Sequence, residues 1–152
     1  MPDDTRLVLA FDLGLKRIGL ASGDTLTRTA APLSTLHSTT GAPDWSGIGK
    51  QIAALTPAQL VVGEPYNADG STSAMTATVR AFAAELAQRF ALPVALIDER
   101  WSSIDAEDRL RAARASGQRR RRVRREDVDA RAAAVILERW FERHPATGQP
   151  QQ

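Results

Sequence analysis

Short apolar runs recur along the chain and predict the strands of a sheet. The clearest runs cover residues 7–11, 18–22, 60–63 and 94–97. A further strand is expected at about 29–36, where Pro32 favours an edge position or a break. Because only a short turn separates the first two runs, they should form an antiparallel hairpin.

Apolar residues at helical spacing predict four helices. Three of them cover about 45–55, 102–115 and 127–143, and the fourth, which precedes the fifth strand, ends near residue 90. Asp44 is well placed to cap the first of them. In the last helix, Ala133, Ile136 and Trp140 follow Asp129 at intervals of four, seven and eleven residues. That spacing puts Asp129 on the face that packs on the sheet.

The order of these elements predicts an α/β fold. Three strands in a meander are followed by helices that alternate with two further strands. The five-stranded sheet should therefore be mixed: antiparallel over its first three strands, parallel between the fourth and fifth, and flanked by helices. The 152 residues are expected to form a single domain (1–152), with a core at about 6–143, disordered ends and a basic loop at about 116–126.

Acidic residues occupy the positions where such a sheet places its functional site. Asp12, Glu64 and Glu99 stand at the carboxyl ends of predicted strands, and Asp129 stands near the start of the last helix. Taken singly, each carboxylate has an ordinary alternative role as a turn residue, an ion-pair partner or a helix-end residue. As a set, Asp12, Glu99 and Asp129 would repel one another unless a divalent cation neutralised them. They therefore predict a site for Mg²⁺ or Mn²⁺ built from oxygen ligands.

Composition narrows the classes of function. Hydrophobic residues make up 43% of the chain and charged residues 25%, as in ordinary globular proteins. No apolar run approaches the about 20 residues that cross a bilayer, and the start of the chain lacks the features of a signal peptide. We therefore expect a cytoplasmic protein without a membrane partner. The chain has no cysteine and two histidines, which excludes a thiol nucleophile and disfavours a zinc site of Cys and His ligands.

Positive charge is concentrated in one segment. The net charge is only +2, but nine arginines and no acidic residue lie between Arg109 and Arg125. A solvated loop is the ordinary alternative for such a run, whereas its position between two acidic segments favours binding of a nucleic-acid phosphate chain. The expected phosphate contacts are Arg119, Arg120, Arg121 and Arg122, together with Lys16 and Arg17 beside Asp12 and Arg100 beside Glu99.

Four blocks of sequence resemble the signature blocks of the YqgF (RuvX-like) family. They are FDLGLKRIGLA at 11–21, VVGEPYNADGS at 61–71, DERWSS at 98–103 and DVDARAA at 127–133, in the family's order. The resemblance spans about residues 6–143. It implies an RNase H-like fold and a metal-dependent nuclease, associated in bacteria with trimming the 5′ end of the 16S ribosomal RNA precursor. An older interpretation, by similarity to the resolvase RuvC, implies a Holliday junction resolvase.

The resemblance places the family's acidic positions on Asp12, Glu99 and Asp129. It implies hydrolysis with two metal ions, Mg²⁺ or Mn²⁺. Leu is common in the family where this chain has Glu64, so Glu64 is either an extra ligand or a replacement for Glu99 as the second acid. We rank Glu99 first because of the motif and Glu64 second because of its place at a neighbouring strand end.

Two other classes of function stay open. Asp12, Leu13 and Gly14 on a strand-turn-strand unit are similar to the phosphate hairpin of actin-like ATPases, although the chain has no second, related domain. A noncatalytic RNA-binding factor of ribosome assembly could keep the fold without the chemistry. The expected partner is nucleic acid, with precursor rRNA first and structured DNA second, and with ribosomal particles as a further partner. The sequence does not report the number of subunits.

Overall fold

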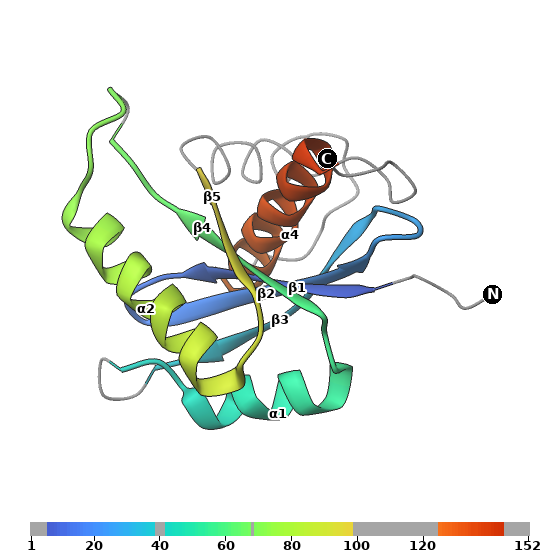
Figure 1. The fold of residues 1–152 in the computed structure, drawn as a ribbon. Helices are drawn as coiled ribbons and strands as arrows, with labels where there is room; N and C mark the ends of the chain where they lie inside the picture. Colours follow the sequence, from blue (N-terminus) through green and yellow to red (C-terminus); the bar gives the residue numbers. More distant parts are fainter. Residues whose placement is uncertain (1–5, 39–41, 68, 99–124, 145–152) are drawn as a thin grey trace, which may run out of the picture.

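The computed structural model describes residues 6–38, 42–67, 69–98 and 125–144. In chain order the elements are β1 (Leu7–Leu13), β2 (Arg17–Asp24), β3 (Ala30–His37), α1 (Trp45–Leu55), β4 (Gln59–Glu64), α2 (Ala74–Phe90), β5 (Val94–Asp98) and α4 (Arg125–Arg143) (Figure 1). The strands lie in one sheet in the order β3-β2-β1-β4-β5.

The sheet is mixed, which confirms the predicted topology. β2 is antiparallel to β1 and β3, because short turns join these strands. β4 is parallel to β1 and β5, and α2 forms the crossover between β4 and β5. β1 is therefore the middle strand, between β2 and β4, and the carboxyl ends of the parallel strands β1, β4 and β5 lie at the same edge of the sheet.

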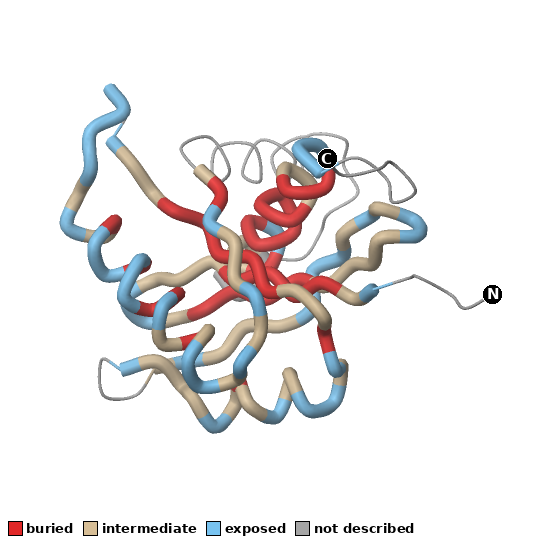
Figure 2. Tube along the Cα trace, in the orientation of Figure 1, coloured by how far each residue is buried: buried red, intermediate tan, exposed pale blue. Residues whose placement is uncertain are grey.

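Helices cover both faces of the sheet: α1 and α2 lie on one face and α4 lies on the other (Figure 1). Side chains of β1 alternate accordingly. Leu9 and Phe11 belong to the core beneath α1 and α2, whereas Val8 and Ala10 pack with α4. Buried residues gather in the central strands and along α4 as a result (Figure 2).

Local signals account for the ends of α1 and α2. Asp44 caps α1 by accepting a hydrogen bond from the backbone nitrogen of Gly47 at 2.9 Å, which confirms the predicted cap. α2 begins with a capping box in which Ser73 and Thr76 bond reciprocally. Each helix ends where the next residue adopts the left-handed conformation that helix C-termini favour.

The edge strand β3 contains Pro32, as the sequence predicted. Its pairing with β2 shifts register between Leu20 and Ala21, and Ala21 is the partner of Pro32. Proline has no N–H to donate to a ladder, so an edge with an irregular register is where a strand tolerates it.

Two residues of the predicted basic loop belong to a helix instead. α4 begins at Arg125 rather than at about 127, so Arg125 and Glu126 are helical. Both are good helix formers, and nothing between 125 and 127 marked a boundary. The predicted helix at 102–115, loop residues 116–124 and the chain ends 1–5 and 145–152 lie outside the described residues. No helix in the described ranges is long and apolar enough to span a bilayer.

α4 approaches the backbone of β2 very closely, because small residues face each other across the contact. A Cβ on Gly19 would lie 2.0 Å from the backbone oxygen of Asp129, so only glycine fits there without a shift. One step along the strand face, Ala21 packs on Ala133 and Ala134. The absence of a side chain at Gly19 therefore fixes how near the sheet Asp129 lies.

Replacing Gly19 with alanine should push the start of α4 away from the sheet. Overpacking of this kind costs roughly 1–3 kcal/mol, so we expect the melting temperature to fall by about 3–10 °C. Thermal unfolding followed by circular dichroism measures the change. Gly49→Ala in α1 is the matched control, because its new Cβ would meet only Phe90, at 3.7 and 3.9 Å. Equal melting temperatures for the two variants would contradict the close contact.

Candidate active site at the carboxyl end of the sheet

Asp12 lies on the face of the sheet that α4 covers. It follows Val8 and Ala10 at two-residue intervals along β1, and both of those side chains pack with α4. Its partner across the antiparallel ladder is Gly19 of β2. Since directly opposite residues have Cα atoms about 4.5–5.5 Å apart, Asp12 stands beside the contact between Gly19 and α4.

Asp129 lies on the same face, in the second turn of α4. Its backbone touches Gly19, the residue opposite Asp12. Its carboxylate accepts a hydrogen bond from Nε of Arg17 at 2.6 Å, and the two side chains are only 24% (Arg17) and 23% (Asp129) exposed. As the spacing of the last helix predicted, this carboxylate faces the sheet, and the backbone of Asp129 lies against the residue opposite Asp12.

The turn between β1 and β2 carries two of the predicted phosphate contacts. The backbone nitrogen of Gly14 donates to the oxygen of Arg17 at 2.8 Å, and a Cβ on Gly14 would lie 2.9 Å from that oxygen. This tight turn presents Lys16 to solvent. The side chain of Arg17 is instead held by Asp129, so the two neighbouring cations differ in what they contact.

Glu64 lies on the opposite face of the sheet. It follows Leu60 and Val62 at two-residue intervals on β4, and both belong to the core beneath α1 and α2. It is buried, with 9% of its surface exposed, and it forms an ion pair with Nε of Arg80 from α2. A buried carboxylate needs such a partner, because desolvation of an unpaired charge is costly.

Arg80 also links Glu64 to the loop after β4. Its Nη2 donates to the hydroxyl of Tyr66 at 3.1 Å. The hydrogen bond to Glu64, and then the one to Tyr66, raise the pKa of Arg80 above its ordinary value, so the guanidinium stays charged. Arg80 of α2 thus neutralises Glu64 on the far face of the sheet. This ion pair argues against Glu64, and therefore for Glu99, as the second acid of the proposed site.

Sequence reasoning missed Arg80, although the sequence contained a signal for it. Arg80 lies four residues after Thr76, a buried position at the start of α2, and so on the same face of that helix. Glu64 has the parity of the apolar core positions of its strand. An acid at a core position and a cation on the facing side of the next helix together indicate an ion pair.

The remaining predicted site residues lie outside the described part of the chain. They are Glu99, Arg100, Arg119, Arg120, Arg121 and Arg122. Along β5, Ala95 and Ile97 pack on the α4 side of the sheet, and Glu99 is the next residue of that alternating series in the sequence.

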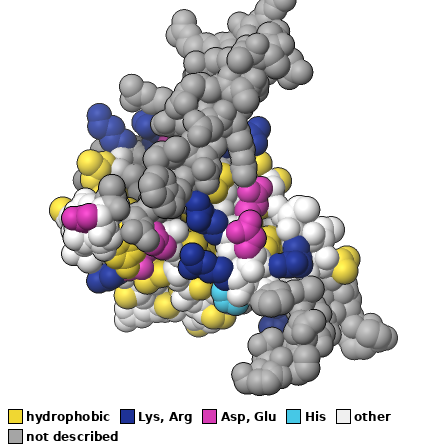
Figure 3. Space-filling model, turned by 90° about the horizontal axis from the view of Figure 1, so that it is seen from above, with side chains coloured by type: hydrophobic (Ala, Val, Ile, Leu, Met, Phe, Trp, Pro, Cys, Tyr) yellow, Lys and Arg dark blue, Asp and Glu magenta, His cyan; other side chains and the backbone are white. Residues whose placement is uncertain are grey.

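The described residues of the site suit a hard cation. Asp12 and Asp129 offer oxygen ligands only, and Asp129 already holds a cationic group, the guanidinium of Arg17. Within the described ranges, no three acidic or histidine side chains gather closely enough to hold a metal ion, and the third acid of the motif is outside them. On the face seen in Figure 3, basic and acidic side chains lie next to one another rather than in separate patches.

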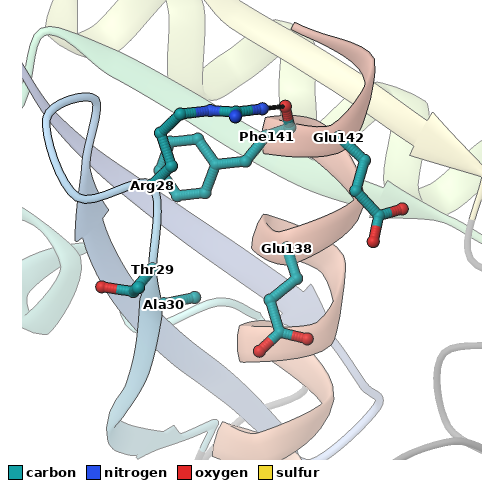
Figure 4. Close-up of a pocket in the computed structure, with 6 residues that line it drawn as sticks. All are labelled: Arg28, Thr29, Ala30, Glu138, Phe141 and Glu142. Atoms are coloured by element: carbon teal, nitrogen blue, oxygen red, sulfur yellow. Dashed lines mark hydrogen bonds between the residues drawn. The ribbon is translucent and has the colours of Figure 1, made fainter. Parts of the chain in front are cut away.

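The far end of α4 is held by Arg28, in the turn between β2 and β3. Its Nη2 donates to the backbone oxygen of Phe141 (Figure 4). At 3.4 Å it also donates to the backbone oxygen of His144. A cation at this end of a helix satisfies free carbonyls and complements the helix dipole. The adjoining hollow is lined by Arg28, Thr29, Ala30, Glu138, Phe141 and Glu142. Phe141 lies about 18 Å along the helix from Asp129, so this hollow is separate from the candidate site.

The sequence blocks and the fold now identify the family. The model of the RuvX family, described as Holliday junction resolvase, matches residues 6–143. The chain belongs to this family.

Relatives of this RuvX-family chain carry a different description. A protein of Dechloromonas aromatica (strain RCB), named "Putative pre-16S rRNA nuclease", is 45% identical over 135 residues, which cover 89% of this chain and 90% of the relative. A protein of the same name from Legionella pneumophila subsp. pneumophila is 43% identical over 134 residues, which cover 88% of this chain and 94% of the relative.

A solved structure confirms the predicted fold class. T. thermophilus RuvC, in complex with Holliday junction substrate, is similar with a TM-score of 0.53 over 91% of this chain and 94% of that chain. At 16% sequence identity the likeness shows the fold alone, which is RNase H-like.

Glu64→Leu should leave the affinity for Mn²⁺ nearly unchanged, whereas Glu99→Gln should weaken it. Because Glu64 faces α2 and is held by Arg80, its replacement should change the dissociation constant by less than about 2-fold, whereas loss of a ligand at Glu99 should weaken binding about 10-fold or more. Isothermal titration calorimetry of the two variants and the wild type measures both. The reverse pattern would make Glu64 the second acid.

Proposed function

We propose that the protein is a metal-dependent nuclease that hydrolyses phosphodiester bonds in the 5′ region of the 16S rRNA precursor. The observation that carries this proposal is the placement of Asp129 against Gly19, directly across the ladder from Asp12 and on the same face. Membership of the RuvX family supports the nuclease chemistry. The names of the relatives support precursor rRNA as the substrate.

Asp12, Glu99 and Asp129 are the residues that would hold the metal, Mg²⁺ or Mn²⁺. When bound, two such ions supply an activated water and stabilise the leaving oxygen, so the chemistry needs no histidine or protein nucleophile. The protein's own contribution would be to hold carboxylates from β1 and α4, together with that of Glu99, which follows β5 in the sequence, at one edge of the sheet. Close packing at Gly19 holds the backbone of Asp129 near the strand that pairs with β1.

Basic residues around this edge are proposed to hold the phosphate chain of the substrate. They are Lys16, Arg17, Arg100, Arg119, Arg120, Arg121 and Arg122. Such contacts are independent of base sequence and sensitive to salt. They suit a substrate presented by a ribosomal particle in the cytoplasm, where the structure of the RNA rather than the protein would select the cleavage position.

Resolution of Holliday junctions is the second candidate function, because the family carries that description. Paired, symmetrical cuts across a junction call for a two-fold dimer. A noncatalytic RNA-binding role is the third, and it requires neither metal nor cleavage.

Single-turnover cleavage of a precursor 16S rRNA fragment, measured beside cleavage of a four-way DNA junction, tests the proposed function. The wild type should cut the RNA in the presence of Mn²⁺ or Mg²⁺. Asp12→Asn should reduce the rate on the order of 100-fold or more, because a ligand of the metal pair is lost. RNA binding by this variant should stay within about 2-fold of the wild type, since phosphate contacts rather than Asp12 supply the affinity.

Three results would overturn parts of the proposal. Cutting of the junction but not of the RNA would favour the resolvase, and a dimer in solution would support that outcome. RNA binding without cutting by the wild type would favour the noncatalytic factor. Metal-independent cutting that survives Asp12→Asn would exclude the proposed site.

Replacing Arg119, Arg120, Arg121 and Arg122 together with glutamine should flatten the salt dependence of RNA binding. If all four contact phosphate, the slope of log K against log salt should fall in magnitude by up to about 3 for single-stranded RNA. Fluorescence anisotropy at several salt concentrations measures the slope. Arg89→Gln is the control, because that arginine pairs with Glu85 on α2. The salt dependence of RNA binding by this variant should have the same slope as that of the wild type. An unchanged slope in the fourfold variant would remove this segment from the interface.

A further inference from the structure

Arg17 occupies an unusual position for a residue expected to meet a phosphate. Its guanidinium lies on Oδ2 of Asp129, at 2.6 Å, in a contact where only a quarter of either side chain is exposed. A charge-assisted hydrogen bond of this length, partly removed from solvent, is stronger than an ordinary surface ion pair. The contact joins β2 to α4 at the centre of the candidate site.

The backbone of Arg17 is fixed, whereas its side chain is long. The oxygen of Arg17 accepts the turn hydrogen bond from Gly14, and Arg17 pairs with His37 across the β2–β3 ladder. The guanidinium can therefore leave Asp129 by rotation about side-chain bonds alone. No movement of β2 or α4 is needed for that exchange.

In the fold without a metal, Arg17 compensates the negative charge of Asp129. α4 sets the backbone of Asp129 against Gly19, the residue opposite Asp12, and a partly buried carboxylate such as that of Asp129 is stabilised by a cation close to it. Arg17 is the cation that the described structure places on Asp129. A divalent ion bound by Asp129 would also neutralise the negative charge of that carboxylate, and it would compete with Arg17 for Oδ2.

We propose that Arg17 is a resident counter-cation that takes the place of the metal on Asp129 in the metal-free protein and is released when the metal binds. This inference rests on the proposed nuclease function. Once released, the guanidinium is free to contact the phosphate of the substrate, which reconciles its predicted role with its observed partner. Arg17 thus couples metal loading to phosphate binding.

A permanent ion pair is the competing account. In that case Arg17 would orient Asp129 through Oδ2 while Oδ1 alone met the metal, and removing Arg17 would weaken metal binding because the carboxylate would lose its orientation. Release predicts the opposite, since removing a competitor tightens metal binding. The sign of the change in affinity therefore distinguishes the two accounts.

The test compares Arg17→Gln with Lys16→Gln by titration calorimetry with Mn²⁺. Both variants lose one positive charge in the same turn, but Lys16 is exposed and only Arg17 lies on Asp129. Arg17→Gln should bind Mn²⁺ about 5-fold more tightly than the wild type, and Lys16→Gln less than about 2-fold more tightly. Without metal, Arg17→Gln should melt below the wild type, and saturating Mn²⁺ should remove most of that difference.

A second measurement uses the wild type and does not depend on a variant that folds. In isotope-labelled protein, the Nε–H resonance of Arg17 should exchange slowly with solvent in the absence of metal and lose this protection as Mg²⁺ is added. Protection that persists at saturating Mg²⁺, or an affinity of Arg17→Gln equal to that of Lys16→Gln or weaker than that of the wild type, would overturn the proposal.

The outcomes separate this inference from the proposed function. If the wild type binds Mn²⁺ and cuts RNA but Arg17 stays on Asp129, only the counter-cation role fails. If the wild type binds no Mn²⁺ at millimolar concentration, the metal-dependent nuclease and the counter-cation role fail together.

Discussion

The contact between Gly19 and the backbone of Asp129 is the constraint on which the candidate site depends. Layers that pack through ordinary side chains lie far apart, about 10 Å in the case of two stacked sheets, and a short Asp side chain does not bridge such a gap. Here Gly19 and Ala21 on the strand, and Ala133 and Ala134 on the helix, let the two backbones approach. The carboxylate of Asp129 then meets Arg17 of β2 directly.

Much of this architecture could be predicted from the sequence, because the signals are local. Apolar runs marked the strands, Asp44 marked the start of α1, Pro32 marked an edge strand, and helical spacing turned Asp129 toward the sheet. Gly19 could not be interpreted in this way. Inside an apolar strand it indicates a bulge or a close approach, but which element approaches is decided by tertiary packing.

The partner of Arg17 lay beyond sequence reasoning for the same reason, whereas the partner of Glu64 was missed although strand parity and helical spacing pointed to it. A basic residue next to a predicted metal ligand is equally consistent with a phosphate contact and with an ion pair, and only the placement of α4 shows that Arg17 meets Asp129. The carboxyl-end position of Glu64 suggested a metal ligand. Strand parity puts it on the other face, where Arg80 neutralises it. Position along a strand locates the edge of the sheet, whereas parity and register decide the face.

Glu64 and Asp129 differ in exposure, and the cations that pair with them differ accordingly. Glu64 is nearly excluded from solvent, so its compensation comes from a cation that stays charged and is also bonded to Tyr66. Asp129 keeps a quarter of its side chain in solvent, and its cation comes from a long side chain on a fixed backbone. A fully buried pair would be too costly to separate, and a fully exposed one too weak to stabilise the metal-free fold. Intermediate exposure is the condition under which one cation can replace another, and Asp129 meets it.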